Sequence, residues 1–182
     1  CEDIALMREI PGMVVINPCD DVEARAAVKA AYEYVGPVYL RFGRLAVPVL
    51  NDESTYKFEI GKGVKLKDGK DISIIATGLC VSEAVKAVDM LAADGIDAEL
   101  INIHTIKPID EDIIAETAQK TGRVFTVEEH SIIGGLGSAV AEVLAEKCPT
   151  KLTRIGVRDT FGESGPAKEL LHKYELDADG IY

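Results

Sequence analysis

The stretch Ile72-Ser-Ile-Ile-Ala-Thr77, followed by Gly78, decides how most of this chain folds. It is a short apolar run that ends at a turn residue, which is typical of a buried strand in a parallel sheet. The residues after it predict a helix that reaches Ala93, with Ser82 or Thr77 as its N-terminal cap. The stretch therefore begins one β-α unit.

The same unit recurs to the end of the chain. Further strands are expected at 98–103, 123–127 and 152–157, and helices at 110–121, 136–148 and 167–174. This alternation predicts a doubly wound, mostly parallel sheet with helices on both faces. We therefore assign residues 71–182 to one three-layer α/β domain.

Residues 1–50 show a shorter version of the alternation. Helices are expected at 3–9 and 20–34, with Asp20 and Glu23 forming a capping box at the start of the second. Strands are expected at 13–16 and 38–42. Two strands are too few for a domain, because sheet edges and an apolar face would be open to water. We expect this part to be the second half of a domain in a chain cut from a longer one.

The segment 51–70 differs from both flanking parts. It is polar and rich in turn residues, with Tyr56–Ile60 as a possible short edge strand. Such composition is typical of a linker that packs on a surface.

The bulk composition excludes several classes of function. The 182 residues carry a net charge of −11, which disfavours nucleic acid and anionic lipid as partners. Four widely spaced cysteines and three histidines give no support for a zinc cluster. We expect free thiols in a reducing cytoplasm. No apolar run approaches the roughly 20 residues that span a bilayer.

Three features are candidates for chemistry. Gly134–Ser138 opens a helix and could bind an anion there, although tight strand-to-helix packing is the favoured interpretation. Glu128-Glu129-His130 follows a strand, and a carboxylate beside a histidine could move protons. Neighbouring strand residues point to opposite sides, however, so a structural or interface role is favoured. His104 is interpreted in the same way.

Arg41 and Arg44 lie at the end of the strand expected at 38–42. Two guanidinium groups near such a loop could bind a phosphate in a bidentate manner. A surface salt bridge in a very acidic protein explains them equally well, and spacing alone does not decide between the two.

The order of these motifs resembles the transketolase family, whose members depend on thiamine diphosphate. Residues 1–50 resemble the second half of its pyrimidine-binding domain, and residues 70–182 its C-terminal domain. The matching stretches are Cys1–Arg8, Pro11-Gly12, Asn17–Glu23, Pro37–Leu45, Ile75–Gly78, Ile106–Asp110, Val127–His130, Gly134–Ser138 and Asp159–Gly162. The resemblance is strongest to transketolases encoded as two chains.

The resemblance implies transfer of a two-carbon ketol unit between sugar phosphates, as in the pentose phosphate pathway. The complete enzyme would use thiamine diphosphate and Mg²⁺, bound by groups that precede the stretch matching Cys1. No catalytic residue, cofactor or metal is therefore expected on this chain alone. The family's phosphate-binding arginine aligns with Arg44, and Arg41 is the second choice. An N-terminal diphosphate-binding chain and a homo-oligomer, such as a dimer, are the implied partners.

Alternatives share the architecture. Deoxyxylulose-phosphate synthase has a similar last domain, and Phe42-Gly43-Arg44 also resembles that synthase. The beta subunit of 2-oxo-acid dehydrogenases is a second alternative. A non-catalytic binding or dimerisation module is a third.

Overall fold

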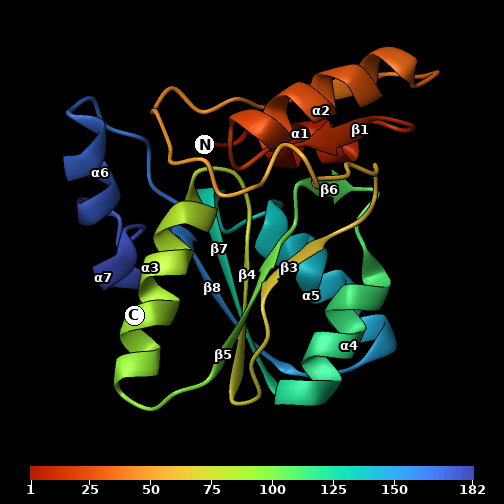
Figure 1. Ribbon diagram of the computed structural model, residues 1–182. Helices are drawn as coiled ribbons and strands as arrows, with labels where there is room; N and C mark the ends of the chain where they lie inside the picture. The colour runs from red at the N-terminus through yellow and green to blue at the C-terminus, as the bar shows by residue number, and fades with distance from the viewer.

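The computed structural model describes all 182 residues and contains two sheets (Figure 1). The larger sheet has five strands in the order β3-β5-β4-β7-β8. These strands are β3 (Val64–Lys67), β4 (Ile72–Ala76), β5 (Ala98–Asn102), β7 (Arg123–Ser131) and β8 (Lys151–Val157). Only β3, at one edge, runs antiparallel to its neighbour. The expected doubly wound, mostly parallel sheet is confirmed.

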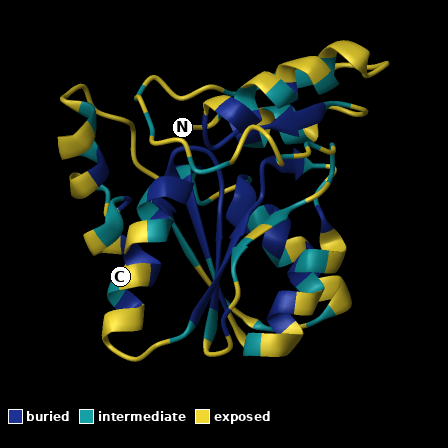
Figure 2. Ribbon diagram, in the orientation of Figure 1, coloured by how far each residue is buried: buried dark blue, intermediate teal, exposed yellow.

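Helices cover both faces of this sheet (Figure 1). One face is covered by α3 (Cys80–Ala93), α6 (Ala167–Lys173) and α7 (Ala178–Ile181), and the other by α4 (Glu111–Thr121) and α5 (Leu136–Lys147). Ile74 belongs to the first apolar cluster and Ile75 to the second, because successive strand residues point to opposite faces. The strands are accordingly buried between exposed outer helix surfaces (Figure 2).

The smaller sheet is built mainly from the first 50 residues. Its central strand β1 (Val14–Ile16) pairs in parallel with β2 (Val38–Leu40) and is flanked by α1 (Asp3–Glu9) and α2 (Asp21–Glu33). On its other side β1 pairs antiparallel with β6 (Thr105–Lys107). The larger domain thus contributes a strand to the half-domain. Our sequence analysis missed β6, because three residues are too short to give a periodic signal.

The segment between the two parts differs from expectation. Residues 56–60 do not form a strand, and the strand in this segment is β3 at 64–67. The Tyr56 hydroxyl bonds to Glu23, and the Phe58 ring lies 4.3 Å from the ring of His104. Side chains of this segment therefore bind it to both parts, while its backbone does not join a sheet.

The two helix starts that we predicted have different outcomes. At α2, Asp20 accepts a hydrogen bond from the Glu23 amide at 2.8 Å, which confirms the cap. At α3, neither expected residue is a cap. Ser82 donates to the carbonyl of Leu79, and Thr77 donates to the carbonyl of Asn17. Tertiary and local carbonyl partners compete with capping for these hydroxyl groups.

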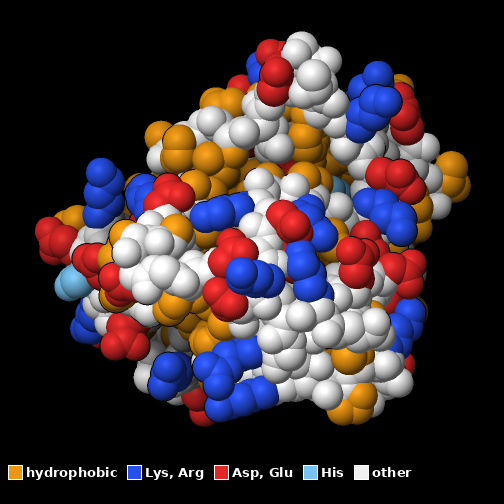
Figure 3. All heavy atoms as spheres, turned by 60° about the horizontal axis from the view of Figure 1, so that its bottom comes forward, with side chains coloured by type: hydrophobic (Ala, Val, Ile, Leu, Met, Phe, Trp, Pro, Cys, Tyr) orange, Lys and Arg blue, Asp and Glu red, His pale blue; other side chains and the backbone are white.

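Charged side chains of both signs are interspersed on the face shown in Figure 3. Many are ion-paired: Lys65 and Lys120 lie 2.9 and 3.1 Å from the buried carboxylate of Glu99. None of the helices combines the length and apolar character that a bilayer crossing needs.

The carboxylate of Glu23 joins three segments of the chain. It is fully buried and accepts the amide of Cys19 at 2.7 Å, the side-chain amide of Asn102 at 2.9 Å and the hydroxyl of Tyr56. Cys19 precedes α2, Tyr56 lies in the connecting segment, and Asn102 ends β5 in the larger domain. One side chain therefore connects both parts and the segment between them.

We predict that Glu23→Gln destabilises the protein by about 1–3 kcal/mol. The amide has one acceptor oxygen, so its NH₂ group would face buried donors that lose their partner. Glu33→Gln, at the exposed end of the same helix, is the control. Urea denaturation measures both free energies of unfolding. Equal values for the two variants would contradict the assigned role.

The glycine-rich turn before α5 receives a carboxylate from the chain itself. Glu128 accepts the amides of Leu136 and Gly137 at 2.6 and 2.8 Å, and a Cβ on Gly135 would collide with its carboxylate. The turn is thus tightly packed, and the N-terminus of α5 already has an anionic partner. Burial raises the pKa of Glu128 to about 7, against the opposing effect of the two backbone hydrogen bonds.

This pKa predicts a pH dependence of stability. The folded value of about 7 lies above the ordinary 4.5, so the carboxyl group's contribution is full below pH 4.5 and is lost as pH rises through 7. The free energy of unfolding of wild type minus that of Glu128→Gln should therefore fall between pH 5.5 and 8. The slope is on the order of 1 kcal/mol per pH unit. Exposed Glu146→Gln should give a flat difference, and a rising difference for Glu128→Gln would refute the prediction.

Candidate functional site

The end of β2 opens into a hollow that contains both arginines singled out in the sequence. Its polar lining consists of Asp3, Tyr39, Arg41, Arg44 and Glu129. The backbone amide of Arg41 still bonds to the carbonyl of Ile16 at 2.8 Å, so the chain leaves the small sheet at this residue. The structure therefore brings the two predicted site residues to one place, at the carboxyl end of a parallel strand.

The guanidinium group of Arg41 is fully engaged inside the protein. Its Nε atom lies 2.9 Å from Oδ2 of Asp3, and its Nη1 atom lies 3.3 Å from Oε2 of Glu129. Its Nη2 atom donates to the backbone carbonyl of Glu129 at 3.0 Å. With 15% of its side chain exposed, Arg41 has the geometry of a structural ion pair.

Asp3 completes this cluster from α1. It also accepts the hydroxyl of Tyr39 at 2.9 Å. Burial alone would raise the pKa of Asp3, but the charge of Arg41 and the hydrogen bonds from Tyr39 and Arg41 lower it below its usual value. The carboxylate is therefore ionised at neutral pH, and its charge is directed at Arg41.

Arg44 differs from Arg41 in every respect that matters for binding. It is exposed, lies in the same hollow, and has no hydrogen-bond or ion-pair partner in the protein. Its guanidinium group is free to bind an anion from solution. Asp3 and Glu129, which distinguish the two arginines, lie 38 and 88 positions from Arg41 in the sequence, so spacing gave no signal of them.

Glu128, Glu129 and His130 have three separate internal partners. Glu128 contacts the start of α5, and Glu129 contacts Arg41. His130 accepts the amide of Ala5 at Nε2, 3.3 Å away, and Nδ1 donates to the carbonyl of Ser131 at 2.7 Å. Burial lowers the pKa of His130, which favours the neutral ring. The three side chains do not face one common ligand.

His104 is also buried within the protein. Its Nδ1 atom lies 2.8 Å from Oγ1 of Thr105, and its ring lies against Phe58. Burial lowers its pKa, so a neutral ring is again favoured. The contacts attach the connecting segment to the end of β5.

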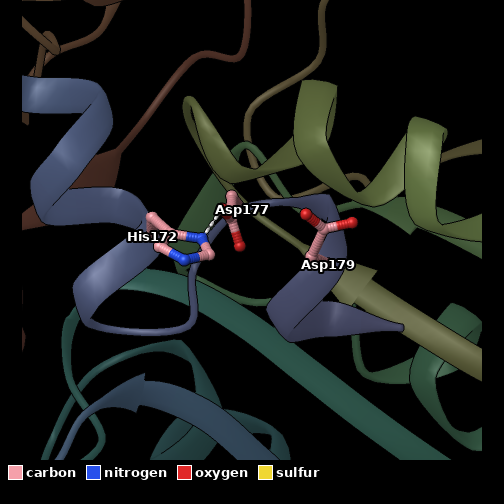
Figure 4. A group of neighbouring side chains, drawn as sticks. All are labelled: His172, Asp177 and Asp179. Atoms are coloured by element: carbon pink, nitrogen blue, oxygen red, sulfur yellow. Dashed lines mark hydrogen bonds and ion pairs between the residues drawn. The ribbon is translucent and has the colours of Figure 1, made fainter.

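One group of side chains has the composition of a metal site. His172, Asp177 and Asp179 lie at the ends of α6 and α7 with ligand atoms within 4.8 Å of one another (Figure 4). Nδ1 of His172 pairs with Oδ2 of Asp177 at 2.7 Å, and Oδ1 of Asp177 caps α7 through the amide of Gly180. The group is explained by an exposed ion pair and a helix cap.

The carboxyl edge of the large sheet, where open α/β sheets commonly bind ligands, is covered by the first 50 residues (Figure 1). The amide of Asn17 donates to the carbonyl of His104 at 2.8 Å, and Thr77 donates to the carbonyl of Asn17 at 3.3 Å. Arg41 contacts Glu129 at the end of β7. The hollow beside Arg44 therefore lies where the two parts meet.

Family models divide the chain as the two sheets do. The pyrimidine binding domain of transketolase matches residues 1–49, and the C-terminal domain of transketolase matches residues 61–181. The second match includes β3, which lies inside the segment expected to be a linker.

Curated relatives extend over more sequence than this chain. A putative transketolase C-terminal section from Methanocaldococcus jannaschii is 51% identical over all of this chain and 57% of the relative. A 6-deoxy-6-sulfo-D-fructose transketolase subunit from Clostridium sp. is 47% identical over 99% of this chain and 56% of the relative. A 1-deoxy-D-xylulose-5-phosphate synthase from Heliobacterium modesticaldum is 39% identical, with 98% and 28% covered. The chain thus spans little more than half the length of the first two.

A solved structure agrees with these matches. It is described as a split-gene transketolase in an inactive beta4 tetramer, and it superposes with a TM-score of 0.95 at 49% identity. The superposition covers 99% of this chain and 59% of that one. Together with the family models, which account for both sheets, this likeness establishes that the chain belongs to the transketolase family.

Proposed function

We propose that this chain is the C-terminal section of an enzyme that transfers a two-carbon ketol unit between sugar phosphates, and that Arg44 binds the substrate's terminal phosphate. The observation that carries the proposal is the contrast between the two arginines of the hollow. Arg41 is held by Asp3 and Glu129, whereas Arg44 is exposed and unpaired. An unpaired guanidinium group suits bidentate binding of a tetrahedral anion.

Thiamine diphosphate supplies the carbanion-stabilising chemistry of such enzymes, and we place it, with Mg²⁺, on the rest of the enzyme. The residues of this chain do not fit the cofactor, because its buried carboxylates already accept hydrogen bonds within the chain. These carboxylates are Asp20, Glu23, Glu99, Asp110 and Glu128. None is free to contact an aminopyrimidine nitrogen. This chain's contribution is therefore substrate binding.

The partners that we propose are a separate N-terminal chain and further copies of this one, as a dimer or larger homo-oligomer. The relative described as a C-terminal section and the structure described as a split-gene transketolase support this arrangement. We place the assembly in the cytoplasm, since all four cysteines are free thiols in the structure.

A second candidate concerns the anion. One relative is named for 6-deoxy-6-sulfo-D-fructose, in which a sulfonate group occupies the terminal position. A sulfonate is also a tetrahedral oxyanion, and Arg44 would bind it through the same contacts. Kinetic comparison of 6-phospho and 6-deoxy-6-sulfo ketoses in the complete enzyme distinguishes the two. Turnover of pyruvate with glyceraldehyde phosphate would instead indicate a synthase like another relative.

Arg44→Ala in the complete enzyme should raise KM for phosphorylated sugars by about tenfold or more, because a hydrogen bond to a charged group contributes roughly 1.5–3 kcal/mol. Unphosphorylated analogues should be affected much less. Arg123→Ala is the matched control, since Arg123 is exposed at the opposite end of the sheet, where β7 begins. Steady-state kinetics with both substrate types measure the effect. Equal losses on both types would overturn the assignment of Arg44.

The isolated chain should not bind thiamine diphosphate and Mg²⁺ with micromolar affinity, because its buried carboxylates are already paired. Titration calorimetry of the chain with both ligands checks this expectation. A micromolar dissociation constant would show that the chain itself carries a cofactor site.

A further inference from the structure

We propose that Glu129, acting through Arg41, positions Arg44 for the terminal anion of the substrate, so that the C-terminal domain takes part in substrate recognition. This inference rests on the proposed function of Arg44 and assigns a task to a residue of β7 that lies outside the binding contact itself.

Glu129 fixes the orientation of the Arg41 side chain. Its carboxylate and its backbone carbonyl contact two different guanidinium nitrogens, at 3.3 and 3.0 Å, while Asp3 contacts a third at 2.9 Å. A planar guanidinium group with all three nitrogens engaged has little freedom to rotate. The backbone of Arg41 is bonded to Ile16 as well, so both parts of the residue are immobilised.

A second anchor lies immediately after Arg44. Leu45 and Val47 pack against the apolar cluster on the α3 side of the large sheet. Only Phe42 and Gly43 separate Arg41 from Arg44, and a Cβ on Gly43 would lie 3.6 Å from the side chain of Leu79. Arg44 is therefore presented between two points that are both attached to the C-terminal domain.

The ion pairs also decide which arginine is available. Asp3 and Glu129 together offset the charge of Arg41, and the unpaired positive charge of the hollow is that of Arg44. Loss of the Glu129 side chain would leave Arg41 with Asp3 and one backbone acceptor. The strand end would then loosen without losing its fold, and Arg44 would meet the anion in a less favourable geometry.

The test uses the complete enzyme and a double-mutant cycle. Glu129→Ala should raise KM for a phosphorylated acceptor about two- to fivefold, and leave kcat and KM for the unphosphorylated analogue unchanged. In an Arg44→Ala background the same substitution should produce no further rise, because its effect passes through Arg44. Glu129→Gln, which keeps a neutral acceptor, should have a smaller effect than Glu129→Ala.

Glu142→Ala is the matched control. It removes another ion pair between the same two parts, with Arg8 at 2.5 Å, but it does not touch β2. It should leave the preference for phosphorylated substrate unchanged. If Glu129→Ala does not fold, as urea denaturation would show, Glu129→Gln in the same cycle gives the answer.

The outcomes separate the two proposals. A normal preference for phosphate in Arg44→Ala overturns the proposed function, and this inference with it. A lost preference in Arg44→Ala with an unchanged one in both Glu129 variants overturns only the inference. An equal rise of KM in both backgrounds also overturns it, because Glu129 would then act independently of Arg44.

Discussion

The buried carboxylate of Glu23 is the contact on which the arrangement of the two parts depends. It accepts donors from the start of α2, from Tyr56 in the connecting segment and from Asn102 at the end of β5. A buried charge without such partners would be very costly, so these segments can only assemble together. The half-domain is thereby fixed over the carboxyl edge of the large sheet, and β6 pairs with β1 beneath it.

This placement explains why the C-terminal domain has no open ligand crevice at the edge where one is expected. The polar groups at that edge are used to bind the first 50 residues. Asn17 contacts the ends of β4 and β5, and Arg41 contacts the end of β7. The hollow that remains lies beside Arg44, at the boundary. Family membership is consistent with an enzyme whose site is assembled from several parts, of which this chain provides one.

Neighbouring residues at the boundary have different tasks. Glu128 neutralises the start of α5, Glu129 orients Arg41, and His130 receives an amide of α1. Adjacent positions on β7 point in opposite directions, so one strand end serves a helix on its own side and the half-domain above it. A run of titratable residues that looks catalytic in sequence is thus a joint between domains.

The sequence by itself determined the large sheet, its helices and the Asp20 cap, because these depend on apolar periodicity and on contacts three or four residues apart. It also indicated that Arg41 and Arg44 share one strand end. Only the tertiary structure decided that Arg41 is paired and Arg44 free, and that β6 joins the smaller sheet. Those outcomes depend on Asp3 and Glu129, distant in sequence from Arg41, and on a three-residue strand, and local sequence patterns carry no information about contacts of that kind.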